Sequence, residues 1–186
     1  MPQDVVDLIM ADHREVERLF DKMREDPESR PMLLPTVTTL LIAHSRAEES
    51  EVYPAARDEA GENDEVAHSQ EEHAGAEELL VKLKQMDVNS ADFGPTLEEL
   101  TEAVLHHVEE EEESVLPGLR TSLSPERLQE LGDAFVEARA EHMGDQPGEA
   151  TKEELLIAAE NAGVEGANAM SRDQLQEAIK PDDSDS

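Results

Sequence analysis

The chain has 186 residues, of which 47 are acidic and 15 are basic, so that its formal charge is −32. A surface this negative is repelled by phosphate groups, which excludes general electrostatic binding to DNA, RNA or anionic lipid. The chain contains no Cys, which excludes disulfide scaffolds, thiolate zinc sites and Cys-ligated iron–sulfur clusters. The first residues lack the cationic and apolar run of a signal peptide, and no apolar stretch approaches the roughly 20 residues of a membrane span. We therefore expect a cytoplasmic protein.

Apolar residues recur every three or four positions along most of the chain, which predicts an all-α fold. The first helix ends before the turn-forming stretch 26–31, and a second is expected over about 32–60, where Pro54 should kink or end it. A third is expected over about 65–86, a fourth over about 95–116, and a fifth from the N-cap Ser124 to about His142. The stripe of the first helix, with one histidine in it, is Val6, Ile9, His13, Val16, Phe20 and Met23.

The sequence contains an internal repeat. The segment 44–54 recurs without a gap at 107–117, with its His, its Glu-Glu pair and its Pro in the same places. The surroundings of His13 recur in the same way around His73. Residues 1–120 therefore form two copies of one helical hairpin, and two such hairpins close naturally into an antiparallel, up-down four-helix bundle.

Four histidines and two glutamates occupy the inward stripes of these helices. Residues four apart lie about 40° apart around a helix and roughly 6 Å along it, so His44 and Glu48 project side by side, as their repeats do. Buried without partners, each polar group would cost on the order of 1–3 kcal/mol, which over the whole set rivals the stability of a domain. The stripes contain no Lys or Arg to compensate, so we expect two divalent or trivalent cations. The predicted metal ligands are His13, His44, Glu48, His73, His107 and Glu111.

The types of ligand narrow the choice of metal. The absence of sulfur argues against Cu(I) and structural zinc, whereas imidazoles with carboxylates suit iron, manganese or zinc. Two bridged metals with histidine-rich terminal ligation favour a pair of iron ions, with manganese as the alternative. We predict no catalytic residue beyond this metal site and no other cofactor.

The duplicated His-x3-Glu-Glu segments, each with a Pro further on, resemble the hemerythrin-like HHE cation-binding family over residues 1–120. The resemblance implies a four-helix bundle with a non-haem, oxo- or hydroxo-bridged di-iron site. It implies that the four histidines are terminal ligands and that Glu48 and Glu111 bridge the metals. Oxygen-carrying members use five histidines, but the positions four residues either side of His73 are Ser69 and Glu77 here.

With fewer imidazoles than the oxygen-carrying members, the chain resembles the branch of the family that is linked to oxidative or nitrosative stress and to iron handling. Fewer terminal ligands leave more open coordination positions, where a small oxidant can bind and react. We therefore expect a protein that handles peroxide, dioxygen or nitric oxide in a stress response, with catalase-like or ferroxidase activity as the candidate reactions. The alternative is a module that senses or stores oxygen, nitric oxide or iron without turnover.

Several other polar residues lie near the predicted ligands in the sequence. The helical phases of His68 and His106 place them towards solvent. Glu17 and Glu77 each follow a predicted ligand by four positions, and either face solvent, hydrogen-bond a ligand or complete a coordination shell. Tyr53 is expected to pack near Pro54, and the fifth helix to dock on the bundle without contributing chemistry.

The remaining sequence divides into short segments. Residues 1–142 are expected to form the bundle with its fifth helix, 143–150 a linker, 151–180 a small helix–turn–helix module and 181–186 a disordered tail. The module weakly resembles the one at the N-terminus of the Rho termination factor and the SAP-like fold, whose relatives often bind nucleic acid. Because residues 151–186 contain nine acidic and three basic residues, we expect a protein partner there instead.

Overall fold

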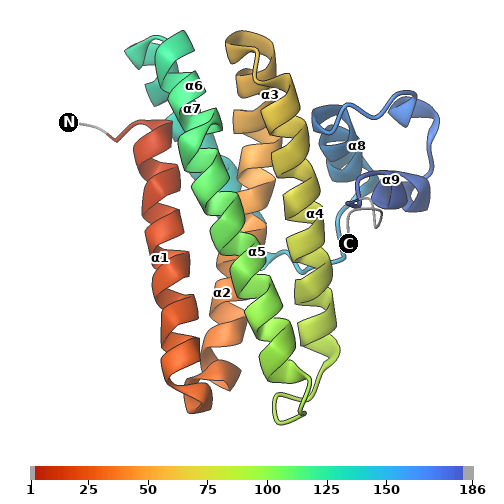
Figure 1. The fold of residues 1–186 in the computed structure, drawn as a ribbon. Coiled ribbons are helices and arrows are strands. Elements are labelled where there is room, and N and C mark those ends of the chain that lie inside the picture. The colour runs from red at the N-terminus through yellow and green to blue at the C-terminus, as the bar shows by residue number, and fades with distance from the viewer. Residues whose placement is uncertain (1–2, 182–186) are drawn as a thin grey trace.

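Helices make up most of the computed structural model, which describes residues 3–181 (Figure 1). Four long helices lie side by side: α1 (Val5–Glu25), α2 (Arg30–Ala47), α4 (Asn63–Gln85) and α5 (Phe93–Glu113). The part of the chain that the structure describes contains no strand, which confirms the predicted all-α class. No helix within it is long and apolar enough to cross a membrane. The shorter helices are α3 (Tyr53–Ala55), α6 (Val115–Ser122), α7 (Pro125–Glu141), α8 (Lys152–Asn161) and α9 (Arg172–Ala178), and the 3-10 turns are η1 (Pro27–Ser29), η4 (His142–Gly144) and η5 (Ala167–Ala169).

The helices begin where side chains satisfy their first backbone N–H groups. The Asp4 carboxylate accepts a hydrogen bond from the Asp7 N–H at the start of α1, at 2.9 Å. At α7 the hydroxyl of Ser124 accepts from the Arg127 N–H, and Pro125 occupies the first helical position, where its missing N–H costs nothing. The expected start of the fifth helix is thus confirmed.

The second long helix does not end at Pro54. It continues through the π-helical turns η2 (Glu48–Val52) and η3 (Ala56–Ala60), with the short α3 between them, as far as the left-handed Gly61. A proline removes one N–H and crowds the carbonyl four residues earlier, and a wider π turn on either side accommodates it. The expected kink or end is therefore replaced by two π turns. The second copy of the repeat differs, because α5 ends at Glu113 and a break at Ser114 separates it from α6.

A polar layer divides the apolar core of the bundle. Ile9 belongs to the cluster at one end, Val16 belongs to the cluster at the other, and His13 lies between them on the same face of α1. The helix α7 packs on α1 and α2 and completes the first cluster with Leu128, Leu131 and Phe135. The predicted ligands thus lie in the middle of the molecule, between two apolar cores that fix the helices.

The C-terminal module lies beside α4 (Figure 1) and has a small core of its own, which includes Leu155, Ala159 and Leu175. The segment before it is bonded to both parts. The Gly148 N–H donates to Glu77 on α4 at 2.8 Å, and the guanidinium of Arg172 donates to the backbone carbonyl of Gly148 at 3.1 Å. Apart from Pro181, the predicted tail 181–186 lies outside the described residues.

Candidate metal centre

The six predicted ligands come together in the polar layer of the bundle. Glu48 and Glu111 are fully buried, and each of the four histidines is at least nine-tenths buried. The Nε2 atom of His44 lies 3.1 Å from Glu48, and that of His13 lies 3.2 Å from Glu111. Four different helical segments therefore direct imidazoles and carboxylates at one small volume, as the repeat predicts.

The donor atoms fall into two groups that share one carboxylate. His13, His44, Glu48 and Glu111 form the first group, and within it the donor atoms lie within 4.8 Å of one another. Glu48, His73 and His107 form the second. One oxygen of Glu48 faces His44 and the other lies 3.4 Å from His73 Nε2. Glu48 therefore belongs to both groups, while Glu111 lies nearer to His13 than to His107, at 3.2 and 4.0 Å.

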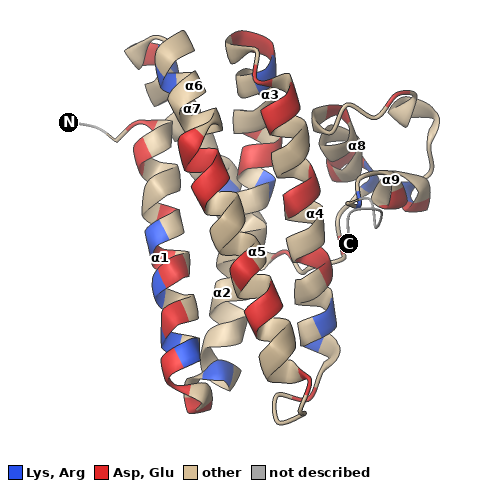
Figure 2. Cartoon of the chain, in the orientation of Figure 1, with Lys and Arg blue, Asp and Glu red and all other residues tan. Residues whose placement is uncertain are grey.

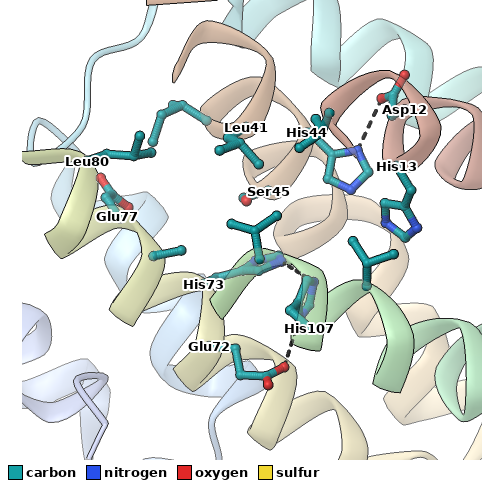
Figure 3. A pocket seen from close by; sticks show the side chains of 15 residues that line it. Asp12, His13, Leu41, His44, Ser45, Glu72, His73, Glu77, Leu80 and His107 are labelled. Carbon is teal, nitrogen blue, oxygen red and sulfur yellow. Dashed lines mark hydrogen bonds and ion pairs between the residues drawn. The ribbon is translucent and has the colours of Figure 1, made fainter. Parts of the chain in front are cut away.

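The unpartnered atoms of the centre fit a metal. Among the described residues, both oxygens of Glu48 and of Glu111 and the Nε2 atoms of His13 and His44 are buried without a hydrogen bond. The Nε2 atoms of His73 and His107 are directed at the same volume and lie 3.1 Å from each other (Figure 3). Buried polar atoms are rarely left unpaired because each costs on the order of 1–3 kcal/mol. Imidazoles with carboxylates and no thiolate match iron, manganese or zinc.

The other ring nitrogen of every predicted histidine ligand contacts a carboxylate. The Nδ1 atom of His44 lies 3.1 Å from Asp12, and that of His107 lies 2.8 Å from Glu72 (Figure 3). A carboxylate at Nδ1 keeps the proton there and leaves Nε2 free to bind a cation, which is typical of metal-binding histidines. The two remaining pairs are His13 with Glu112 at 2.9 Å and His73 with Glu49 at 3.1 Å.

These four supporting acids follow the same repeat as the ligands. Asp12 comes directly before a predicted histidine ligand, as Glu72 does in the second copy. Glu49 comes directly after a predicted glutamate ligand, as Glu112 does in the second copy. The predictions did not include these four acids as partners of the predicted ligands. Their recurrence at equivalent positions was the signal that would have identified them.

The electrostatics of the centre favour positive charge. Burial alone would lower the pKa of His44, but Glu48 and Asp12 raise it to about 10. Burial would also lower the pKa of His73, but Glu48 and Glu49 raise it to about 9. Conversely, burial would raise the pKa of Glu48, yet the neighbouring imidazoles hold it well below its ordinary value. The pocket thus keeps the Glu48 carboxylate ionised, and a cation beside it would be stabilised.

Tyr53 lies in the centre rather than only packing near Pro54. The side chain is fully buried, and its hydroxyl oxygen lies 3.1 Å from His73 Nε2. The π turn at Glu48–Val52 takes more residues per turn than an α-helix, so it changes the direction in which Tyr53 points relative to His44. Burial and the nearby carboxylates raise its pKa well above the ordinary value, so the hydroxyl keeps its proton. The repeat has Leu116 at this position, so only one half of the centre has a phenol.

Two arginines hold supporting acids in place. Arg46, which is 6 % exposed, contacts Glu49 at 3.1 Å and Glu77 at 2.8 Å. On the other side of the centre Arg14 contacts Glu17 and Glu112. In this structure Glu17 and Glu77 thus bind arginines rather than the ligand imidazoles.

Helix α7 contributes to the surroundings of the site, which the sequence did not predict. The ring of Phe135 packs edge-on against His44, with 5.6 Å between the ring centroids. The guanidinium of Arg139 contacts Asp12, the acid that holds His44. The fifth helix therefore fixes the orientation of one ligand through an aromatic contact and an ion pair.

The C-terminal module also reaches the centre through buried amides. The side-chain amide of Asn161, at the end of α8, donates to the backbone carbonyl of Glu49 at 2.9 Å and to Gln70 at 3.2 Å. Gln70 in turn donates to the Glu49 carboxylate at 3.0 Å, and that carboxylate contacts His73. Asn161 is 1 % exposed, so this chain of hydrogen bonds is shielded from water.

A small cavity of about 30 Å³ opens beside the imidazoles. The four predicted histidine ligands line it, together with the apolar side chains of Leu41 and Leu80 (Figure 3) and of Val104. A water molecule needs roughly 10–15 Å³ of such space, so the cavity holds only very small molecules. His68 and His106 line none of it; their side chains are 56 % and 61 % exposed, which confirms that they face solvent.

We expect Asp12→Asn to weaken metal binding about 10- to 100-fold, because the substitution removes the charge that holds His44 Nδ1. Competition with a chelator of known affinity measures the change. Asp21→Asn, an exposed acid-to-amide substitution on the same helix, is the control and should bind metal as the unmodified protein does. Equal affinities for the Asp12 and Asp21 variants would contradict the supporting role of Asp12.

We expect Asn161→Ala to lower the free energy of unfolding by about 1–3 kcal/mol, because Gln70 and the Glu49 carbonyl lose a buried donor. Denaturant titration measures this loss. Asn168→Ala, at an exposed position of the same module, is the matched control. If both variants unfold alike, Asn161 does not stabilise the contact between the module and the bundle.

Comparison with known proteins agrees with this geometry. The sequence profile of the Hemerythrin HHE cation binding domain matches residues 4–119. The chain is 27% identical over 150 residues to a DNA nickase of Nostoc sp., covering 80% of this chain and 42% of that protein. It is 30% identical over 135 residues to an uncharacterized hemerythrin-like protein of Schizosaccharomyces pombe, covering 70% of this chain and 66% of that one. The chain thus spans less than two thirds of the length of either relative. No solved structure matches it significantly.

Proposed function

Because this chain belongs to the hemerythrin HHE cation-binding domain family, we propose that it binds two iron ions in the polar layer and handles a small oxidant there. His13, His44, His73 and His107 would be the terminal ligands, and Glu48 and Glu111 the bridging ones. The observation that supports this most strongly is the pair of buried donor groups that share Glu48. Both oxygens of Glu48 and Glu111, and the Nε2 atoms of His13 and His44, have no hydrogen bond. We further infer that α1, α2, α4 and α5 form the up-down antiparallel unit of the family, with α7 docked on it.

Iron is the metal that this proposal assigns, and manganese is the alternative. When bound, a pair of iron ions would supply a change of oxidation state and open positions for a small oxidant. The chain supplies the rest: Asp12, Glu49, Glu72 and Glu112 orient the imidazoles through their Nδ1 atoms.

The cavity indicates which oxidants would reach the centre. Its volume of about 30 Å³ and its apolar wall favour peroxide, dioxygen or nitric oxide, which are small and uncharged. The formal charge of −32 disfavours anionic oxidants, which the surface repels. The Tyr53 hydroxyl does not line the cavity, but its oxygen lies 3.1 Å from Nε2 of His73, which does line it.

One observation favours the alternative, a sensor without turnover. The Asn161–Gln70–Glu49 hydrogen bonds join His73 to the C-terminal module. A change at His73 would therefore alter the contacts of a separate helical unit, which is what a signal to a protein partner requires. In this alternative the partner binds the module at residues 151–180.

We propose no nucleic-acid partner. The relative from Nostoc sp. is named a DNA nickase, but this chain matches only 42% of it. The charge of −32, and the predominance of acidic residues on the bundle helices in Figure 2, oppose contact with a phosphate backbone.

Metal analysis and peroxide assays test the proposal. Protein made without a histidine tag in iron-replete cells should contain two iron ions per chain, and substantially less than a single ion would overturn the di-iron assignment. Oxygen evolution from added peroxide, lost in His44→Ala but retained in His142→Ala, would support turnover. Iron-loaded protein that binds an oxidant reversibly and evolves no oxygen would favour the sensor.

A further inference from the structure

A second group of metal-binding side chains lies on the surface formed by α4 and α5. His68 and Glu72 are one helical turn apart on α4, and His106 and Glu110 are one turn apart on α5. His68 Nε2 lies 2.8 Å from Glu110 and 3.5 Å from Glu72. His106 Nε2 lies 3.3 Å from Glu110 and 3.9 Å from Glu72. Each imidazole thus faces both carboxylates.

One of these carboxylates belongs to both sites. One oxygen of Glu72 accepts the hydrogen bond from His107 Nδ1 at 2.8 Å, while the other is directed at His68 and His106. Glu72 also borders both the cavity of the buried centre and a hollow of about 480 Å³ on the surface, which His106 lines as well. It therefore connects the surface group to a predicted ligand of the buried centre.

The repeat shows that this surface group is not a by-product of the duplication. In the first copy the positions of His68, His106 and Glu110 are taken by Leu8, Ala43 and Ala47. Ala43 and Ala47 are fully buried, and α7 packs on that side of the bundle. Only Glu72 has an acidic counterpart there, Asp12. The two surface histidines, His68 and His106, thus occur on the solvent-exposed side of the bundle. The equivalent positions on the side that α7 covers have no histidine.

The hollow beside the group is acidic. Glu71, Glu78 and Glu99 line it, together with the single cation Lys82. Acidic walls raise the local concentration of cations. Exposed ion pairs alone contribute little to stability, so the convergence of two imidazoles on two carboxylates calls for another reason. Two nitrogens and two carboxylates suit Fe²⁺, Mn²⁺, Co²⁺ or Zn²⁺, whereas Ca²⁺ and Mg²⁺ prefer oxygen ligands.

We propose that His68, His106, Glu72 and Glu110 bind a divalent transition-metal ion at the surface, and that this site delivers iron to the buried centre beside Glu72. The delivery role rests on the proposed function, whereas surface binding does not. No bond is made or broken in the delivery, since the ion exchanges one set of donors for another.

A cobalt titration of the iron-loaded protein tests the surface site. We expect Co²⁺ to bind with the visible absorption of a nitrogen–oxygen site, and its affinity to fall by about tenfold or more in a His68→Ala/His106→Ala variant. The control His142→Ala removes the histidine of another surface group, with Asp145 and Glu154, and should leave this affinity unchanged. Equal affinity in the unmodified protein and the double variant, or a loss in His142→Ala instead, overturns the proposal.

The kinetics of iron uptake test the delivery role. Metal-free double variant should take up Fe²⁺ about tenfold more slowly than the unmodified protein and reach the same final iron content. An unchanged rate overturns delivery, and so does a lower final content, because the histidines would then belong to the buried centre. Failure of the proposed function is distinguishable, since the unmodified protein would then retain no iron while the cobalt titration still reports the surface site.

Discussion

Replacing Glu48 with alanine is expected to abolish binding of both proposed metal ions. One oxygen of this carboxylate faces His44 and the other faces His73, so the substitution removes a donor from both groups at once. Metal binding at a concentration about 1,000 times Kd stabilises a folded protein by roughly 4 kcal/mol. For a chain of this size that free energy corresponds to about 8–16 °C in Tm. We expect the iron-loaded protein to lose a stabilisation of this order in Glu48→Ala.

Elemental analysis and thermal unfolding, with and without iron, measure these two losses. Glu113→Ala is the matched control, because it removes an exposed glutamate near the ligand Glu111 and should keep both the iron and the Tm. Glu48→Gln preserves the size of the side chain and separates the loss of charge from the loss of volume. A Glu48→Ala protein that retains both ions would refute the bridging role.

Replacing Arg46 with methionine should lower the free energy of unfolding by about 3–5 kcal/mol, which is the usual effect of removing one partner from a buried ion pair. Arg46 is 6 % exposed and contacts both Glu49 and Glu77. Without it, Glu49 becomes a buried carboxylate whose remaining partners are His73 and Gln70. The Arg46 guanidinium is a main reason that the pKa of Glu49 lies at about 2, although burial would raise it.

Thermal unfolding of metal-free protein checks this prediction, with an expected decrease in Tm of roughly 6–20 °C. The control is Arg18→Met, which removes an exposed ion pair with Glu15 and should leave the Tm almost unchanged, because solvent screens exposed pairs. The two variants have the same change in composition and differ in burial. Comparable stabilities for the two would show that the buried pair contributes no more than a surface one.

The helices and the six converging residues could be predicted from the sequence for two physical reasons. Apolar periodicity determines which face of a helix is buried, so a histidine on that face, such as His13, must point inward. Duplication then provides an independent check, because His44 and Glu48 recur with the same spacing in a second hairpin. The assignment of these residues as ligands stays a prediction until a metal is measured.

Other features depend on packing between segments that are distant in sequence. Arg46 is not on the inward stripe of its own helix, and its partner Glu77 comes from α4. Tyr53 points inward because a π turn changes the helical phase. Apolar periodicity could not predict this direction, because it assumes an unbroken α-helix. Asn161 reaches Glu49 only because α8 packs against η2, and no pattern within residues 151–180 indicates that contact.

The amide of Asn161 also has a consequence for the order in which the protein matures. Chains are synthesised from the N-terminus and fold as they emerge, so the ribosome releases all six predicted ligands before it adds Asn161. A nascent chain can thus bring its two hairpins together while Glu49 still lacks that donor. The last helices to be translated close this side of the centre, so the proposed metal ions would have an interval in which to enter the emerging bundle before it closes.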